Sequence, residues 1–216
     1  TYPQSSVVRQ WPDIVWILCM FLFIKSGKRR WLAAASVTTG FALWYMVSIG
    51  AYMWGSLTVM TIMLALRETK SSSRRWWECV WPPALGLLSA AVFFYFLCGP
   101  WFFSAVFWHN AMDFIKMFLL TNTVFLNESL IHKKFINYFM FCVIVGTYVA
   151  TIIRVALTYL LNKNFSKMDC LSLGLSIYGL GLLEHFVTFS NGNNFYSKMV
   201  PFFAVLFFWL GKYQPL

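Results

Sequence analysis

Charged residues are scarce in this sequence, and acidic residues are the scarcest. Only 11% of its 216 residues are charged, and seven are Asp or Glu, whereas about 25% of the residues in a soluble domain are charged. Hydrophobic residues make up 60% of the chain and aromatic residues 20%. A water-soluble fold could not bury that much apolar surface. The sequence therefore predicts an all-α integral membrane protein and excludes an ordinary soluble domain.

Patterns of metal-binding and catalytic residues are missing as well. The histidines fall in different segments with no repeating spacing, and the cysteines are scattered with no C-x-x-C pair (His109, His132 and His185; Cys19, Cys79, Cys98, Cys142 and Cys170). Neither a Ser-His-Asp set nor a phosphate-binding glycine loop can be recognised. We therefore expect no metal, no haem and no catalytic residue in this chain, and we interpret the cysteines as small apolar residues.

Basic residues are the exception to the low charge, because they give the chain a formal net charge of +10. They stand in short clusters between apolar runs, such as Lys25–Arg30 and the pair Arg74-Arg75. A nucleic-acid surface is one interpretation. We favour loop anchors that meet anionic lipid headgroups, and we expect membrane lipids and no nucleic acid as partners.

The chain divides into an N-terminal segment, residues 1–30, and a transmembrane domain, residues 31–216. The apolar stretch Trp11–Ile24 contains Pro12 and Asp13 and is short of the ~20 residues that a spanning helix needs. It therefore predicts an interfacial or partly inserted helix. Lysines follow it where a signal peptide would have its small-residue cleavage site, so we expect no cleavable signal.

The transmembrane domain is predicted to contain about seven spanning helices. The first two form a hairpin with Gly50 as its candidate break, Pro82-Pro83 marks the start of the third helix, and Gly99-Pro100 is a candidate kink. Small residues on the sixth span predict close approach of another helix, namely Gly174, Gly179 and Gly181. The predicted spans are Trp31–Ser48, Ile49–Leu66, Ala84–Trp108, Asn110–Ile131, Phe135–Leu161, Asp169–Ser190 and one from Phe195 or Tyr196 to near Lys212.

A few ionisable residues lie inside these spans, where their burial is costly. Arg154 needs a partner or must extend its guanidinium to the membrane surface. We favour an interpretation of Asp113 and Lys116 as residues near a membrane interface, although their i,i+3 spacing would also let them pair on one helix face. Glu184 and His185 point about 100° apart on a helix, so at least one of them contacts a neighbouring helix. We expect a packing contact there rather than catalysis.

The pair Trp76-Trp77 directly follows Arg74-Arg75. Indole N–H donors, flat amphipathic rings and cations together suit the phosphate of a phospholipid headgroup. A plain belt of aromatic residues at the membrane interface explains the same residues equally well. Both interpretations place this segment at the level of the lipid headgroups.

The order of landmarks along the chain resembles that of subunit III of the haem-copper cytochrome c oxidases. That family has a first hairpin, a Trp-Trp pair with charge beside it, a Pro-Pro, and a long aromatic helix that ends in tryptophan and histidine. It also has an aspartate at the start of its sixth helix, a glycine- and histidine-containing stretch, and an aromatic last helix. The matching pieces here are Trp31–Trp44, Trp76-Trp77-Glu78, Pro82-Pro83, Phe102–His109, Asp169-Cys170, Gly179–Val187 with His185, and Met199–Gly211.

The resemblance implies a seven-helix subunit without redox centres. It would pack against catalytic subunit I, with subunit II in the same complex, and hold phospholipids in a cleft between its first two helices and the other five. Haem a and copper would lie in those partner subunits, and the complex would lie in the mitochondrial inner membrane or a bacterial plasma membrane. The resemblance adds His109 to the candidate lipid-binding residues and Asp169 to the polar packing residues. The family's acid in its third helix has no counterpart, since Ser89–Leu97 contains none.

Other functions fit parts of the same sequence. In a small transporter or channel, Arg154, Glu184 and His185 would line a pathway together with the glycines of the sixth span. A lipid-modifying enzyme would use Asp113, His109 or His185. An accessory subunit of another membrane complex is a further alternative. The oxidase subunit remains our leading hypothesis.

Overall fold

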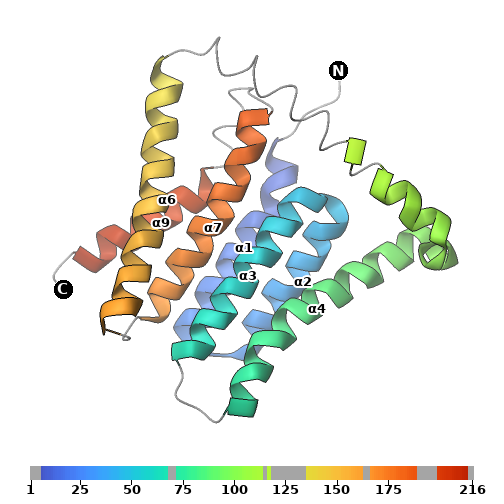
Figure 1. Cartoon of the computed structure of the whole chain (residues 1–216), viewed down its shortest axis with the longest axis horizontal. Helices are drawn as coiled ribbons and strands as arrows, with labels where there is room; N and C mark the ends of the chain where they lie inside the picture. The colour runs from blue at the N-terminus through green and yellow to red at the C-terminus, as the bar shows by residue number, and fades with distance from the viewer. Residues whose placement is uncertain are drawn as a thin grey trace.

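The computed structural model describes residues 6–67, 72–113, 116–117, 135–162, 166–188 and 199–213. All regular elements in these ranges are helices, which confirms the predicted all-α class (Figure 1). Residues 105–113 are helical as well. The elements are α1 (Ser6–Ser26), α2 (Arg29–Tyr45), α3 (Val47–Arg67), α4 (Ser72–Cys98), the 3₁₀ helix η1 (Gly99–Phe103), α6 (Phe135–Asn162), α7 (Lys167–Thr188) and α9 (Val200–Tyr213).

Three helical stretches in the described residues are long and apolar enough to cross a membrane. They are Val47–Arg67, Trp76–Phe103 and Phe139–Leu161, with mean hydropathies of 1.6, 1.7 and 2.1. The apolar stretch Val200–Gly211 in α9 is shorter than the ~20 residues that a crossing needs. The chain thus has the character of a membrane protein, and the number of seven crossings stays a prediction.

The predicted hairpin of α2 and α3 lies in the middle of the molecule. α2 packs against α1, α3 and α4, and α3 packs against α4 and also against α7. α6 and α9 lie beside α7, and α4 lies on the other side of the hairpin (Figure 1). This differs from the expected separation into a hairpin and a five-helix bundle, because α3 contacts helices on both sides.

Helix α1 is longer and better packed than the short segment Trp11–Ile24 predicted from the sequence. It has 21 residues, and its Trp16 and Met20 are fully buried in the hydrophobic core. Asp13 is also fully buried, and the hydroxyl of Tyr178 in α7 donates to it at 2.6 Å. Because Asp13 has a hydrogen-bond partner inside the bundle, it does not force the helix to the surface.

The break between α2 and α3 falls at Met46, not at the predicted Gly50. Met46 has extended backbone angles and is the single residue between the two helices. Gly50 lies in the first turn of α3, where a Cβ atom would come within 2.6 Å of the carbonyl carbon of Ala42. A side chain at this position would therefore collide with the end of α2, and glycine is needed for the tight corner.

Helix α4 does not begin at Pro82-Pro83, as the sequence predicts, but at Ser72, and both prolines lie inside it. Proline inside a helix removes a hydrogen bond and costs ~3 kcal/mol. Here α3 supplies polar contacts at the same place. The Thr61 hydroxyl lies 3.5 Å from the carbonyl oxygen of Cys79, the one that Pro83 cannot bond, and the Trp54 indole donates to the Pro83 carbonyl at 3.0 Å.

Helix α4 ends at Gly99-Pro100, where the sequence predicted a kink. Gly99 has a φ of +59°, α4 ends one residue before it, and η1 follows. Ser104 then caps residues 105–113, because its hydroxyl accepts from the backbone N–H of Phe107 at 3.1 Å. α4 therefore ends ten residues before Trp108, the predicted end of the third span.

The predicted close approach of helices at the glycines of α7 is confirmed. A Cβ on Gly181 would come within 2.9 Å of Tyr52 in α3, and one on Gly179 within 2.6 Å of the Tyr148 ring in α6. At Gly174, the Ser56 hydroxyl of α3 donates to the glycine carbonyl at 2.5 Å. The glycines of α7 thus allow two neighbouring helices to pack closely, because α3 contacts two of these glycines and α6 contacts the third.

Candidate functional site: the basic end of the bundle

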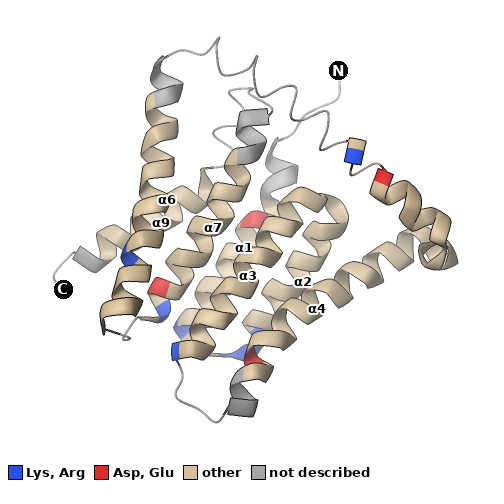
Figure 2. Ribbon diagram, in the orientation of Figure 1, with Lys and Arg blue, Asp and Glu red and all other residues tan. Residues whose placement is uncertain are grey.

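Lys and Arg residues gather at one end of the bundle, which we call the basic end (Figure 2). Helices α1 and α3 finish at this end, and α2, α4 and α7 begin there. The described members of this group are Lys25, Lys28, Arg29, Arg30, Arg67 and Lys167. The sequence predicted basic clusters in the loops, and the fold brings clusters far apart in the chain to one side.

α4 ends and α6 begins at the end of the bundle opposite the basic end (Figure 1). α4 begins at the basic end and finishes at the other, and α6 runs back and finishes beside the start of α7. The predicted span Asn110–Ile131 falls between the end of η1 and the start of α6 and stays a prediction. Residues 114–115 and 118–131 of that span lie outside the described residues.

A tight corner joins α1 to α2 at the basic end. Gly27 has a φ of +66°, a conformation that glycine adopts without strain. Lys28 is the N-cap of α2 and makes no side-chain capping bond, and arginines follow at the next two positions. Cations at a helix N-terminus are unfavourable next to the positive end of the helix dipole. An acid from elsewhere is therefore expected beside them.

Glu78 of α4 supplies that acid. Its carboxylate forms an ion pair with the guanidinium of Arg29, and its other oxygen accepts from the Trp81 indole at 3.2 Å. The pair joins the first turn of α2 to the second turn of α4. Sequence reasoning assigned no role to Arg29, Glu78 or Trp81 as a group, since Arg29 and Glu78 lie 49 positions apart and only packing brings them together.

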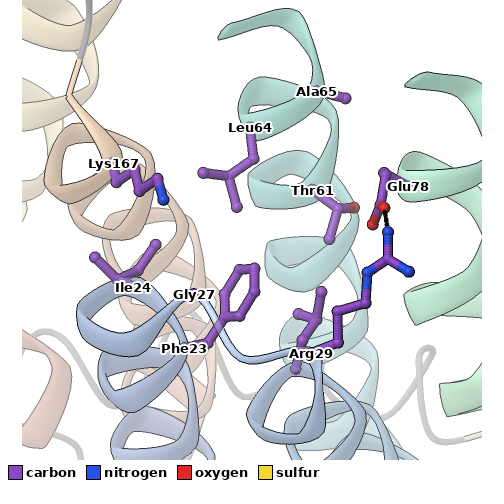
Figure 3. Close-up of a pocket in the computed structure, with 10 residues that line it drawn as sticks. Phe23, Ile24, Gly27, Arg29, Thr61, Leu64, Ala65, Glu78 and Lys167 are labelled. Carbon is purple, nitrogen blue, oxygen red and sulfur yellow. Dashed lines mark hydrogen bonds and ion pairs between the residues drawn. The ribbon is translucent and has the colours of Figure 1, made fainter. Parts of the chain in front are cut away.

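A cavity of about 140 Å³ lies behind this ion pair. Figure 3 shows Lys167 of α7 extending toward the cavity from one side, with Arg29 and Glu78 on the other. Apolar side chains, such as Phe23 and Leu64, form the rest of the wall. Its size admits several water molecules or one small anionic group, and its two cations against one carboxylate favour an anion.

Trp76 and Trp77 border two different grooves. Trp77 lines a shallow groove together with Trp81, Arg29 and Arg30. Trp76 lies at one end of an apolar groove of about 750 Å³ between α3 and α4. Both rings are largely exposed. The side chains of the predicted partners, Arg74 and Arg75, lie outside the described part of the chain.

The apolar groove has the dimensions of a lipid acyl chain in one leaflet. Along α4 it reaches from Trp76 to Leu87, which is ~16 Å of helix and close to half of the ~30 Å hydrocarbon core. Its two walls belong to α3 and α4, both of which are apolar enough to cross a membrane. Its lining residues on α3 are Trp54, Thr58, Ile62, Ala65 and Leu66, and those on α4 include Val80, Pro83 and Ala84.

His109 is not part of this arrangement. It lies beyond η1, at the other end of α4 from the tryptophans, with its side chain 78% exposed. Its imidazole lies 3.3 Å from Asp113, which Lys116 approaches at 3.4 Å. The Asp113–Lys116 pair that the spacing allows is thus present. A whole helix separates His109 from Trp76 and Trp77, so the structure does not bring these three candidate residues together, and a role of His109 in lipid binding stays a prediction.

Arg154 finds a partner in Asp169 on the next helix. The guanidinium of this arginine of α6 lies 2.5 Å from the carboxylate of Asp169 in α7, and 5.4 Å from the centre of the Trp209 ring of α9. The other carboxylate oxygen of Asp169 accepts from the backbone N–H and the hydroxyl of Ser166, at 2.9 and 2.7 Å. The polar cluster therefore ties three helices together near the basic end.

The start of α7 is capped by Ser166. The sequence Ser166-Lys-Met-Asp169 forms a capping box, since the N–H of Asp169 also donates to the Ser166 hydroxyl at 3.1 Å. A local motif of this kind can be recognised from the sequence alone. Glu184 and His185 belong to the same helix, but their side chains lie outside the described residues, so their expected packing contact stays a prediction.

The described residues hold no group of three or more His, Cys, Asp or Glu side chains placed to bind a metal ion. The polar features of the described fold are ion pairs and hydrogen bonds between helices, together with the grooves and the cavity at the basic end. Comparison with protein-family models, with curated proteins and with solved structures finds no match to this chain.

Proposed function

We propose that this chain is a membrane-embedded, non-redox structural subunit of a respiratory terminal oxidase, similar to subunit III of the cytochrome c oxidases. In this role it packs beside catalytic subunit I, which with subunit II holds the haem a and the copper. The membrane is the mitochondrial inner membrane, or the plasma membrane in a bacterium. The order of landmarks from Trp31 to Gly211 supports the similarity to this family. The main support for a structural role is that the buried polar residues form contacts between helices.

Those buried polar residues hold helices together. Arg154 pairs with Asp169, Tyr178 donates to Asp13, and Ser56 donates to the Gly174 carbonyl. Each contact joins two helices, at a distance of 2.5 or 2.6 Å. Polar groups used in this way fix helix packing, which is what a scaffold subunit needs.

Phospholipid binding belongs to the same proposal. The apolar groove beside Trp76 fits an acyl chain, and the shallow groove with Arg30 and Trp77 presents a cation and indole rings where a phosphate would lie. Both grooves reach the basic end. A phospholipid bound there would fill the surface between α4 and the hairpin.

The alternative of a transporter or channel receives less support from the geometry. It needs the glycines of α7 to line a pathway, yet Tyr148 and Tyr52 fill the space beside Gly179 and Gly181. It also needs an available cation at Arg154, which is engaged by Asp169. These contacts favour a role of the residues in helix packing over a role in a transport pathway.

The experiment that tests the oxidase role is extraction of the native membrane in a mild detergent, followed by native electrophoresis and a reduced-minus-oxidised spectrum of the band that contains this chain. We expect a haem a signal and larger subunits in the same band. Migration of the chain alone would refute a subunit role. Migration in a haem-free complex would refute the oxidase and leave an accessory subunit of another complex.

A further inference from the structure

The described charges distribute unevenly between the two ends of the bundle. The basic end carries Lys25, Lys28, Arg29, Arg30, Arg67 and Lys167. The acids described near it, Glu78 and Asp169, each pair with an arginine. The two connections at this end, residues 68–71 and 163–165, are short, and in the sequence they contain Lys70 and Lys163 together with one acid, Glu68. The excess of positive charge thus lies in short loops and at helix ends next to them.

The opposite end is different. Its described ionisable side chains include His109 and Lys116, and both contact the same acid, Asp113. Between α2 and α3 the chain turns at Met46 and carries no charge there. Lysine and arginine in short loops hold those loops on the side of the membrane from which a chain is inserted. By that rule, the two ends of this bundle face opposite sides of the membrane.

We propose that the basic end faces the compartment from which the chain is inserted, with its cations against the anionic headgroups of that leaflet, and that Met46 and η1 face the other compartment. The inserting side is the matrix for a mitochondrial inner membrane and the cytoplasm for a bacterial plasma membrane. The attraction of Lys and Arg to an anionic leaflet acts in the same direction as the insertion rule. This orientation does not depend on the oxidase role.

Single cysteines at the two ends test the orientation in sealed membrane vesicles of known sidedness. The background replaces Cys19, Cys79, Cys98, Cys142 and Cys170 with alanine. Ser26→Cys reports on the basic end and Met112→Cys on the opposite end, since both positions are exposed, and Lys28→Cys is a second reporter for the basic end. An impermeant maleimide is added to the outer face before and after permeabilisation.

In vesicles with the inserting side enclosed, we expect Met112→Cys to react before permeabilisation and Ser26→Cys to gain label severalfold only afterwards. Labelling of Ser26→Cys from outside, or of Met112→Cys only after permeabilisation, overturns the proposal. Replacing Lys25, Lys28, Arg30 and Lys167 by glutamine in the Ser26→Cys chain should raise its outside labelling severalfold. The matched control exchanges Lys for Arg and Arg for Lys at these positions and should leave the labelling unchanged.

Discussion

Arg154 and Asp169 lie on consecutive antiparallel helices, with the guanidinium 2.5 Å from the carboxylate and the Trp209 ring beside the cation. Asp169 is almost fully buried, so the removal of either charge leaves its partner in a poorly hydrated place. We expect Arg154→Leu to destabilise the protein by about 3 kcal/mol, because one partner of a buried pair is lost. The measurement is the thermal unfolding midpoint in detergent.

The double variant Arg154→Leu/Asp169→Leu is the control for this prediction. It leaves no lone buried charge and should recover part of the stability lost in the single variant. Ser166→Ala removes both contacts of the hydroxyl with Asp169, keeps the ion pair, and should cost about 1 kcal/mol. A stability for Arg154→Leu equal to that of the parent would mean that the ion pair is not a packing contact.

Asp13 and Tyr178 give a second prediction. Tyr178→Phe removes the hydroxyl that donates to the buried Asp13 carboxyl while keeping the ring against Trp16. We expect a loss of about 1–3 kcal/mol, since a buried acceptor loses its donor. Tyr95→Phe, at an exposed position, is the matched control and should leave the unfolding midpoint unchanged; equal effects at the two tyrosines would contradict the role of Asp13.

The crossing of α2 and α4 depends on Gly40. A Cβ there would lie 2.5 Å from the carbonyl oxygen of Gly86 and 2.7 Å from the backbone nitrogen of Ala90, so even alanine forces the helices apart. We expect Gly40→Ala to cost about 1–3 kcal/mol. Gly55→Ala has open space around its Cβ and should be neutral or slightly stabilising, because alanine is the better helix former.

Filling the apolar groove should displace lipid. Ala84→Trp places a large ring between α3 and α4, where Ala84 lines the groove, and we expect fewer phospholipids bound to the purified protein, as counted by native mass spectrometry. Leu97→Trp, exposed on α4 and outside the groove, is the control. The same lipid count in both variants would show that the groove holds no lipid.

Features that depend on composition or on near neighbours could be predicted from the sequence. The helical class follows from the apolar content, the Asp113–Lys116 pair from its spacing, and the Ser166–Asp169 cap from a local motif. The glycine contacts of α7 also followed from residue size. In each case the relevant residues are close in the chain or need no partner to be identified.

Pairs that lie far apart in the chain could not be predicted, because packing alone chooses the partner. Asp13 meets Tyr178 across 165 positions, and its helix was cut short in the prediction because the partner was unknown. The start of α4 was misplaced for a similar reason. Pro82-Pro83 normally indicates a helix start. Here both prolines lie inside the helix, where Thr61 and Trp54 of the neighbouring helix provide polar contacts around them.

The single residue Met46 between α2 and α3 constrains how these two helices can move. Two helices of 17 and 21 residues joined by one residue have no loop that could absorb a change in the angle between them. Because Gly50 lies directly against the end of α2, a shift of either helix must displace the other. α2 and α3 therefore form one unit, against which α4 packs on one side and α7 on the other.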